Sequence, residues 1–266
     1  MTEHYARVLC LMREKYDYPR AYMKKTSAPT PYMLVPGLWA EAVLPKNGEV
    51  TDRILDRYHT MLLNSADPVN NLLGTLSVIF WGFATMGGRA PDRANKHLTG
   101  YKSKPGTTHY AAGQAMAAVR AETNLGTALG HLAPLAVLGQ MPFASKIIAH
   151  SRPNVAGIMD NQLASGLALD AWAQNVPFLR SIGAVDEPRY QRRYAAWCGF
   201  LCVLADQLNA GIANGIPWGW RENGRTHRWR AIDVERALFQ YYRWKKKSSL
   251  TLSALLELQQ PEPEVV

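Results

Sequence analysis

Cysteine is scarce in this sequence, and its scarcity excludes whole classes of structure. The only cysteines are Cys10, Cys198 and Cys202. An odd number at irregular spacing implies no disulfide framework and indicates a reducing compartment. Cys198 and Cys202 have no further thiols to complete a four-thiolate site, so we interpret them as small buried side chains. We therefore expect no metal and no cofactor.

Uninterrupted apolar runs are also missing. Residues 1–16 lack the apolar core of a signal peptide. Residues 68–88 and 123–145 carry almost no charge but are interrupted by proline, asparagine and glycine. A membrane-spanning helix needs about 20 predominantly apolar residues. We therefore expect a cytoplasmic protein without a membrane partner, in which both runs form buried core helices.

Acidic side chains are too few to balance the basic ones. The chain has 30 Lys plus Arg against 21 Asp plus Glu, a formal net charge of +9. Such an excess suits a polyanionic partner such as nucleic acid. Two alternatives stay open, namely an ordinary soluble protein that is merely basic and a protein that lies on an anionic membrane surface.

What the sequence does have is apolar residues at helical spacing, with little strand-like alternation. The spacing predicts one all-α domain over residues 1–266. We expect a helix near 51–65 with Ile54, Leu55, Tyr58, Met61 and Leu62 on its apolar side. Residues 18–50 are rich in proline and predict an irregular arm, residues 87–108 a basic loop that either faces DNA or is an ordinary connection, and residues 260–266 a frayed tail.

The segment PFASKIIAHSRPNVAGIMD, residues 142–160, contains one lysine and one aspartate. The surrounding pattern predicts a helix over 125–138, a tight turn, a short helix from Ser145, and another helix starting at Asp160. In this helix–hairpin–helix over 132–151, backbone N–H groups can hold a DNA phosphate. Taken singly, Lys146 could simply reach solvent or bind phosphate, and Asp160 could be an ordinary helix cap.

Two stretches together resemble the helix–hairpin–helix DNA glycosylases, specifically the prokaryotic members of the 8-oxoguanine glycosylase branch. LAVLGQMPFASKIIAHS…AGIMDNQLASGL resembles the catalytic region of that branch. The resemblance makes Lys146 the nucleophile and Asp160 the catalytic aspartate. WRAIDVERALFQYYR resembles the base-pocket helix, here 231–243, with Glu235 as the base reader, Phe239 as the stacking ring and His150 lining the pocket. It implies the glycosylase fold without a clear β-domain.

The sequence departs from the family pattern at the hairpin and in the pocket. Pro142 and Ala144 stand where the family has two glycines, and proline has no N–H to donate. Glu235 replaces a glutamine, and an ionised carboxylate only accepts hydrogen bonds. The DNA contacts implied are the hairpin and the basic C-terminal region, namely Phe143, Ala144, Ser145, Arg225, Arg228 and Arg230.

The resemblance implies a monomeric DNA glycosylase, a hydrolase of N-glycosyl bonds that acts on double-stranded DNA containing a modified base. A lysine nucleophile would form a Schiff base, so an associated AP lyase activity is expected. The excised base is either oxidised guanine, in DNA repair, or a bulky modified cytosine of phage DNA, in antiviral defence. The alternative is a non-catalytic helix–hairpin–helix DNA-binding module. Trp218, Trp220 and Trp229 are interpreted as packing residues.

Overall fold

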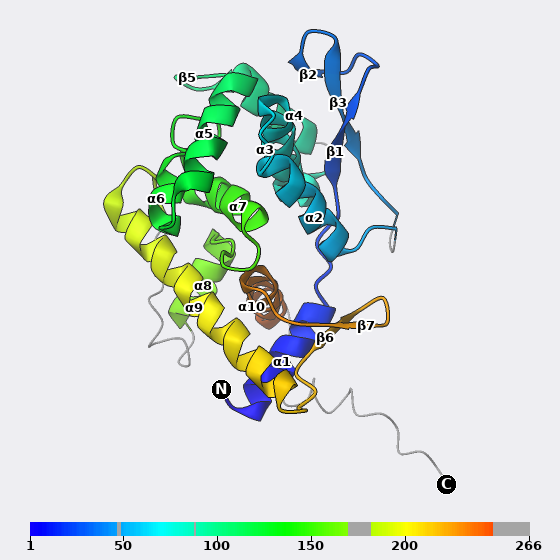
Figure 1. The fold of residues 1–266 in the computed structure, drawn as a ribbon, viewed down its shortest axis with the longest axis vertical. Coiled ribbons are helices and arrows are strands. Elements are labelled where there is room, and N and C mark those ends of the chain that lie inside the picture. Colours follow the sequence, from blue (N-terminus) through cyan, green and yellow to red (C-terminus); the bar gives the residue numbers. More distant parts are fainter. Residues whose placement is uncertain (47–48, 88, 170–181, 247–266) are drawn as a thin grey trace.

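The structure, a computed structural model, describes residues 1–46, 49–87, 89–169 and 182–246. This part of the chain is mostly helical (Figure 1). Its helices are α1 (Glu3–Glu14), α2 (Asp52–Leu63), α3 (Pro68–Phe83), the 3-10 helix η1 (Ala84–Met86), α4 (Arg89–Thr99), α5 (His109–Ala121), α6 (Leu125–Gly130), α7 (Met141–Ser151), α8 (Asn161–Leu169), α9 (Pro188–Ala213) and α10 (Ala231–Lys245).

Two helices organise the packing. α3 is almost wholly apolar and packs against α2, α4, α5 and α7. α10 is packed against α1, α8 and α9, and Figure 1 shows it nearly end-on with these helices around it. One hydrophobic core runs through both groups. The end of α3 and one face of α10 both border the candidate site.

The proline-rich arm was predicted to be irregular, and this prediction was wrong. Residues 22–43 form an antiparallel sheet in the order β1 (Tyr22–Thr26), β3 (Leu38–Val43), β2 (Tyr32–Val35). Met23 donates its N–H to Ser77 Oγ on α3 at 2.9 Å, which fixes the sheet to the core. Gly37, with φ 82°, makes the tight turn between β2 and β3. Strands this short show too little alternation to be recognised in sequence.

The basic loop predicted over 87–108 is instead largely structured. It contains α4 and a two-stranded hairpin of β4 (Gly100–Tyr101) and β5 (Lys104–Pro105). α4 buries Ala90, Ala94 and His97, which recur at helical spacing. Small alanines gave no strong apolar signal, so the buried face was missed. A second hairpin, β6 (Trp220–Glu222) and β7 (Arg225–His227), precedes α10.

The helices of the predicted helix–hairpin–helix differ from the prediction in where they begin and end. α6 ends at Gly130, and turns and a bend follow up to Val137, so the first helix is shorter than predicted. α7 begins at Met141, so Pro142 lies in its first turn. Proline is tolerated there because the N–H that it lacks would have no partner within the helix. Lys146 therefore lies in the second turn of α7. Residues 260–266 lie outside the described residues.

Among the described residues, two helical stretches are long and apolar enough to cross a membrane by length and composition alone. They are Pro68–Met86, most of which is buried within the protein, and Pro188–Ala213, of which a smaller share is buried. Core helices of globular proteins pass the same test. Neither stretch therefore decides where the protein resides.

Candidate active site

A cavity of about 620 Å³ lies at the junction of the two helix groups. Its volume falls in the range of small-molecule sites, roughly 300–1,000 Å³. We call it the central cavity. It is lined by Tyr16, Tyr18, Trp81, Gly82, Thr85, Lys146, Ile158, Asp160, Gln162, Glu235, Phe239, Arg243 and Lys246. Four residues singled out from the sequence, Lys146, Asp160, Glu235 and Phe239, thus line one cavity.

Lys146 is a nearly buried amine on α7, with 8% of its surface exposed. Its Nζ donates a hydrogen bond to Pro142 O at 3.0 Å and lies 5.1 Å from the centre of the Phe143 ring. Burial lowers the pKa of Lys146, and the charges of Asp160 and Glu235 oppose that shift. Burial therefore favours the neutral amine, the form that attacks carbon.

Gly82 of α3 makes room for this lysine. A Cβ on Gly82 would lie 2.9 Å from Lys146 Cδ, closer than real contacts allow, and a tight 3.1 Å from Cε. The alkyl chain of Lys146 therefore runs directly along the α3 backbone. The carbonyl of Gly82 accepts a hydrogen bond from the Tyr18 hydroxyl at 2.8 Å. Gly82 is thus a contact point for both lysine and tyrosine.

Asp160 caps α8 as its position predicted. Its Oδ1 accepts a hydrogen bond from Leu163 N at 3.0 Å. Ser145, the neighbour of Lys146, fixes the approach of this segment, because its Oγ accepts from Met159 N at 3.1 Å and donates to Met159 O at 3.2 Å. The loop before Asp160 is therefore tied to the helix that carries Lys146.

Glu235 is a buried carboxyl group, 2% exposed, and its Oε2 has no hydrogen-bond partner among the described residues. Burial and the nearby charge of Asp160 raise its pKa to about 8, while the charges of Arg236 and Lys146 oppose the rise. At neutral pH the group is therefore mostly protonated and offers one donor and one acceptor. Gly157 lets it pack closely, since a Cβ there would lie 3.0 Å from Glu235 Cβ.

Aromatic rings form one wall of the cavity. The centre of the Tyr18 ring lies 4.9 Å from that of Trp81 and 6.2 Å from that of Phe239. Tyr16 packs edge-on to Phe239 at 6.3 Å. Such rings offer faces and edges for a planar ligand.

Two cations, Arg243 and Lys246, line the cavity near the end of α10. Arg243 forms an ion pair of 2.6 Å with Asp17, which lies between the two cavity tyrosines in sequence. Both partners are partly exposed. The pair links α10 to the segment that follows α1.

His150 does not line the cavity, contrary to the prediction. Its ring is fully buried, edge-on to Trp81 at 4.8 Å, and its Nδ1 lies 3.4 Å from Asp56 Oδ1. His150 lies one helical turn after Lys146, and its side chain lies behind the cavity wall and faces α2. Burial lowers the pKa of His150, against the effect of Asp56.

The predicted hairpin contacts to DNA are mostly unavailable. Ala144 and Ser145 are completely buried. The Ala144 N–H is donated to Gln140 O and the Met141 N–H to Gly183 O. Because α7 begins earlier than predicted, these residues fall inside the helix rather than in an open turn. Phe143 is half-buried, with its ring 4.2 Å from that of Phe83.

Of the predicted C-terminal arginines, Arg225 and Arg228 are exposed, but Arg230 is not available to DNA. Its guanidinium bonds Asp56 and Asp233, and these carboxylates raise its pKa despite burial. It belongs to a buried ion network made of Arg13, Asp52, Arg53, Asp56, Arg230, Asp233 and Arg236. Trp220 and Trp229 are buried, as expected of packing residues.

Sequence reasoning found Phe239 but missed the other rings of the aromatic wall, Tyr16, Tyr18 and Trp81, and also Gly82. Trp81 lies in an uncharged and mostly apolar helix, where an aromatic residue indicates core packing. The signals that could have found them are weak, namely a glycine inside a helix and two tyrosines closely spaced before a proline. Within the described ranges, no group of three or more His, Cys, Asp or Glu side chains could hold a metal ion.

Comparisons of the chain with protein-family models, with curated proteins and with solved structures found no match. The arrangement of residues in the central cavity therefore carries the functional argument by itself.

Proposed function

We propose that this protein is a DNA glycosylase of helix–hairpin–helix type that excises a modified base from DNA. The observation that supports the proposal best is the meeting of Lys146, Asp160, Glu235 and Phe239 in the central cavity. They come from α7, the loop before α8, and α10. A nucleophile, a carboxylate, a hydrogen-bonding group and a stacking ring are the parts that base excision needs.

In the proposed reaction the nucleotide is extruded from the duplex and its base enters the aromatic cavity. The neutral amine of Lys146 attacks C1′, and the base leaves with the electrons of the N-glycosidic bond. Asp160 stabilises the positive charge that develops on the sugar. Loss of a proton from nitrogen and opening of the sugar ring then give a Schiff base, from which β-elimination nicks the strand.

Glu235 is proposed to read the base as a neutral acid, with one donor and one acceptor. Cytosine presents the matching pair, N3 as acceptor and the 4-amino group as donor. Oxidised guanine also does so, because oxidation places a proton on N7 beside O6. The same edge of ordinary guanine presents two acceptors, which a single donor cannot satisfy. Oxidised guanine and a modified cytosine both remain candidate substrates.

The main alternative is a DNA-binding module without catalysis. Such a module would need phosphate-binding groups, and it would gain nothing from a buried amine beside a neutral acid. The features of the central cavity therefore favour the enzyme.

The test is borohydride trapping on labelled duplexes that contain 8-oxoguanine, uracil, an abasic site or glucosylated hydroxymethylcytosine. Borohydride reduces a Schiff base to a stable cross-link. We expect a cross-link that Lys146→Gln abolishes, while affinity for the duplex stays within about threefold, because one buried amine contributes little to phosphate binding.

Lys24→Gln is the matched control, since Lys24 is half-exposed on β1 and paired with Glu41. It should trap as the wild type does. Mass spectrometry of the cross-linked peptide adds a second readout. A cross-link that persists in Lys146→Gln, or that maps to Lys246, would remove Lys146 from its proposed role. No trapping and no base release on any duplex would favour the binding module.

A further inference from the structure

A second cavity, of about 450 Å³, adjoins the central cavity. Phe83 and Phe143 line it, and Phe143 also touches Lys146, which lines the central cavity. We call this second cavity the basic groove. Its walls come from α4, the β4–β5 hairpin, the turns before α7, and residues 184 and 186.

The basic groove concentrates unpaired positive charge. Its lining holds four cationic side chains, Arg93, Lys96, Lys102 and Lys104, against the one carboxylate of Asp186. In the part of the chain that the structure describes, none of the four cations forms an ion pair. The buried ion network, by contrast, satisfies its arginines with carboxylates. Cations without a carboxylate partner in a groove suit an anion that comes from outside.

Aromatic rings hold three of these cations in place. Lys96 Nζ lies 5.0 Å and Lys102 Nζ 5.5 Å from the centre of the Tyr101 ring. The Arg93 guanidinium lies 5.6 Å from that of Phe83. Lys104 Nζ donates to Ala133 O, so its ammonium lies against the turns before α7. These contacts place the four charges along the groove, where Lys102 and Lys104 are exposed to solvent.

The backbone of the groove adds a second observation. Val137, which lines it, has φ 69°, a left-handed conformation that β-branched residues rarely adopt. Such strain is found most often at functional sites. The start of α7, which was predicted to be the DNA-binding hairpin, lies next to Val137. It cannot offer many N–H donors, because Pro142 has none and those of Met141 and Ala144 are engaged. Side-chain cations would have to replace them.

We propose that the basic groove binds the phosphate backbone of a DNA duplex beside the nucleotide that enters the central cavity. This inference rests on the proposed glycosylase function. A strand that crosses Phe83 and Phe143 would place its phosphates on α4 and the β4–β5 hairpin. These contacts carry no sequence information, as an enzyme that searches DNA for a rare base requires.

The test compares affinity for an undamaged duplex, by fluorescence anisotropy, between the wild type and Lys96→Ala/Lys102→Asn. Alanine suits the interior of α4, and asparagine tolerates the positive φ of Lys102. We expect at least tenfold weaker binding. The slope of log affinity against log salt should become shallower by about 1.8, roughly 0.9 for each phosphate that the variant no longer neutralises.

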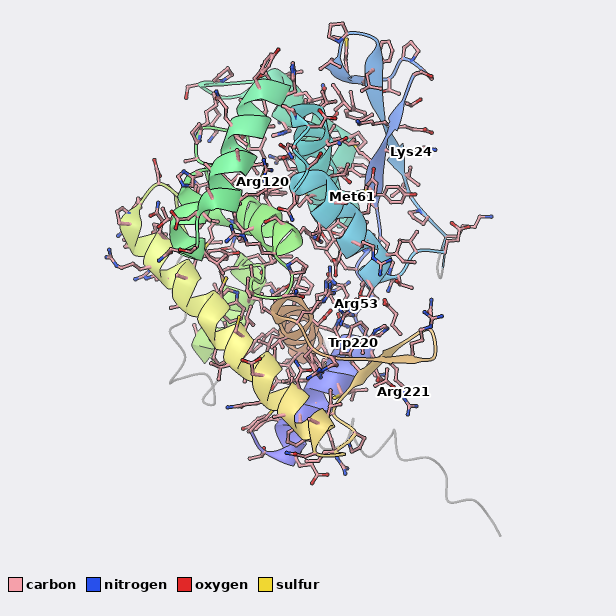
Figure 2. The ribbon with its side chains drawn as sticks, viewed as in Figure 1. Lys24, Arg53, Met61, Arg120, Trp220 and Arg221 are labelled. Carbon is pink, nitrogen blue, oxygen red and sulfur yellow. The ribbon has the colours of Figure 1, made fainter. Side chains whose placement is uncertain are left out.

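The control is Lys24→Ala/Lys25→Ala on β1, which removes the same charge. Figure 2 shows Lys24 on the sheet, on the other side of the view from β5 in Figure 1. It should bind within about twofold of the wild type. Unchanged affinity in the groove variant, or an equal loss in the control, would overturn the proposal. Matching melting temperatures would show that both variants fold.

Trapping separates this proposal from the proposed function. At protein concentrations that saturate the duplex, the groove variant should still form the Lys146 cross-link on an abasic site. If the wild type never traps, the glycosylase proposal fails, yet the affinity measurement still tests the groove. If the wild type traps and the groove variant binds as tightly, only the groove proposal fails.

Discussion

Glu235 illustrates at the scale of one residue how environment changes what a side chain can do. From sequence it was an ionised carboxylate that only accepts hydrogen bonds. Its burial, with Asp160 nearby, raises its pKa to about 8 and gives it a proton to donate at neutral pH. The substrate pairing expected from its residue type therefore differs from that expected from its site.

Glu235→Gln should remove a pH dependence of the proposed reaction. We expect kcat/KM for base release in the wild type to fall above pH 8, approaching about tenfold per unit, as the acid loses its proton. Glutamine keeps one donor and one acceptor without titrating, so the variant should stay flat in this range. A wild-type rate that does not fall above pH 8 would contradict the role of the proton.

The same substitution has a consequence for stability. The pKa of Glu235 in the folded protein lies above its ordinary value of 4.5, so the folded state binds this proton more tightly. The resulting stability is complete below about pH 4.5 and is lost as pH rises towards 8. The free energy of unfolding of Glu235→Gln, relative to that of the wild type, should therefore rise from pH 5 to pH 8 in denaturant titrations.

Gly82→Ala should impair trapping without lowering stability. The new Cβ displaces the flexible chain of Lys146, while alanine favours a helix interior by about 0.5–1 kcal/mol. We expect a tenfold or larger loss of cross-link and an unchanged or slightly higher melting temperature. Gly199→Ala in α9 meets nothing within 4 Å and is the control. Normal trapping by Gly82→Ala would show that the contact with α3 does not position the lysine.

At the scale of elements, α2 shows why an apolar pattern can mislead. The sequence predicted Ile54, Leu55, Tyr58, Met61 and Leu62 on the apolar side. Ile54 and Met61 are instead exposed, by 52% and 61%, and Asp52, Asp56 and His59 are buried. Figure 2 shows Met61 on α2 and Arg53 beside Trp220 of β6. α2 buries its charged face because arginines of α1 and α10 form ion pairs with its aspartates in the interior.

Ser145→Ala tests the link between α7 and the loop before α8. It leaves the buried N–H of Met159 without a partner, which costs about 1–3 kcal/mol. We expect that loss in the free energy of unfolding, measured in urea, together with weaker trapping as Asp160 loosens. Ser151→Ala removes only a bond within its own helix and should cost less. Equal losses in both variants would show that the hydrogen bonds between Ser145 and Met159 contribute no more than a bond within one helix.

At the scale of the whole molecule, the buried ion network joins parts that are far apart in sequence. Arg13 of α1 reaches Asp52 and Asp233, and Arg236 of α10 reaches Asp56. Arg236 is also the neighbour of Glu235 and opposes the rise of its pKa. The paired charges of the network therefore stabilise α10, the helix that carries Glu235, the proposed base reader.

Asp56→Asn should be strongly destabilising, because it leaves the buried charges of Arg230 and Arg236 without the carboxylate that pairs with both. The expected cost is about 3–5 kcal/mol in the free energy of unfolding. Asp17→Asn is the control, since Asp17 also pairs with an arginine but is 67% exposed. It should cost less than about 1 kcal/mol. Similar costs for the two variants would contradict the account of the network.

Acid should weaken the wild type for the same reason. Arginines hold the pKa of Asp56 well below its ordinary value and that of Asp233 at about 2, against their burial. Because both pKa values are lowered in the folded state, the two carboxylates stabilise the fold above the ordinary pKa of about 3.9. This contribution is lost as pH falls from 4 towards 2. The loss should be smaller in Asp56→Asn, as measured by thermal unfolding over this range.

The sequence by itself determined the mostly helical character and the positions of α1, α2, α3, α5, α9 and α10, because apolar spacing and capping residues such as Thr51 and Asp67 act locally. Its motifs also singled out Lys146, Asp160, Glu235 and Phe239. Short strands, the alanine face of α4 and the inward face of α2 gave no local signal. Their structure depends on partners elsewhere in the chain.

Only the tertiary structure decided which residues meet. It placed Trp81, Gly82 and the tyrosines around Lys146, turned His150 away from the central cavity, and enclosed Arg230 in the buried ion network. It also raised the pKa of Glu235 and lowered that of Lys146. The physical reason is that burial and charge pairing depend on distance in space, and residues as far apart in sequence as Tyr16 and Lys246 define one cavity here.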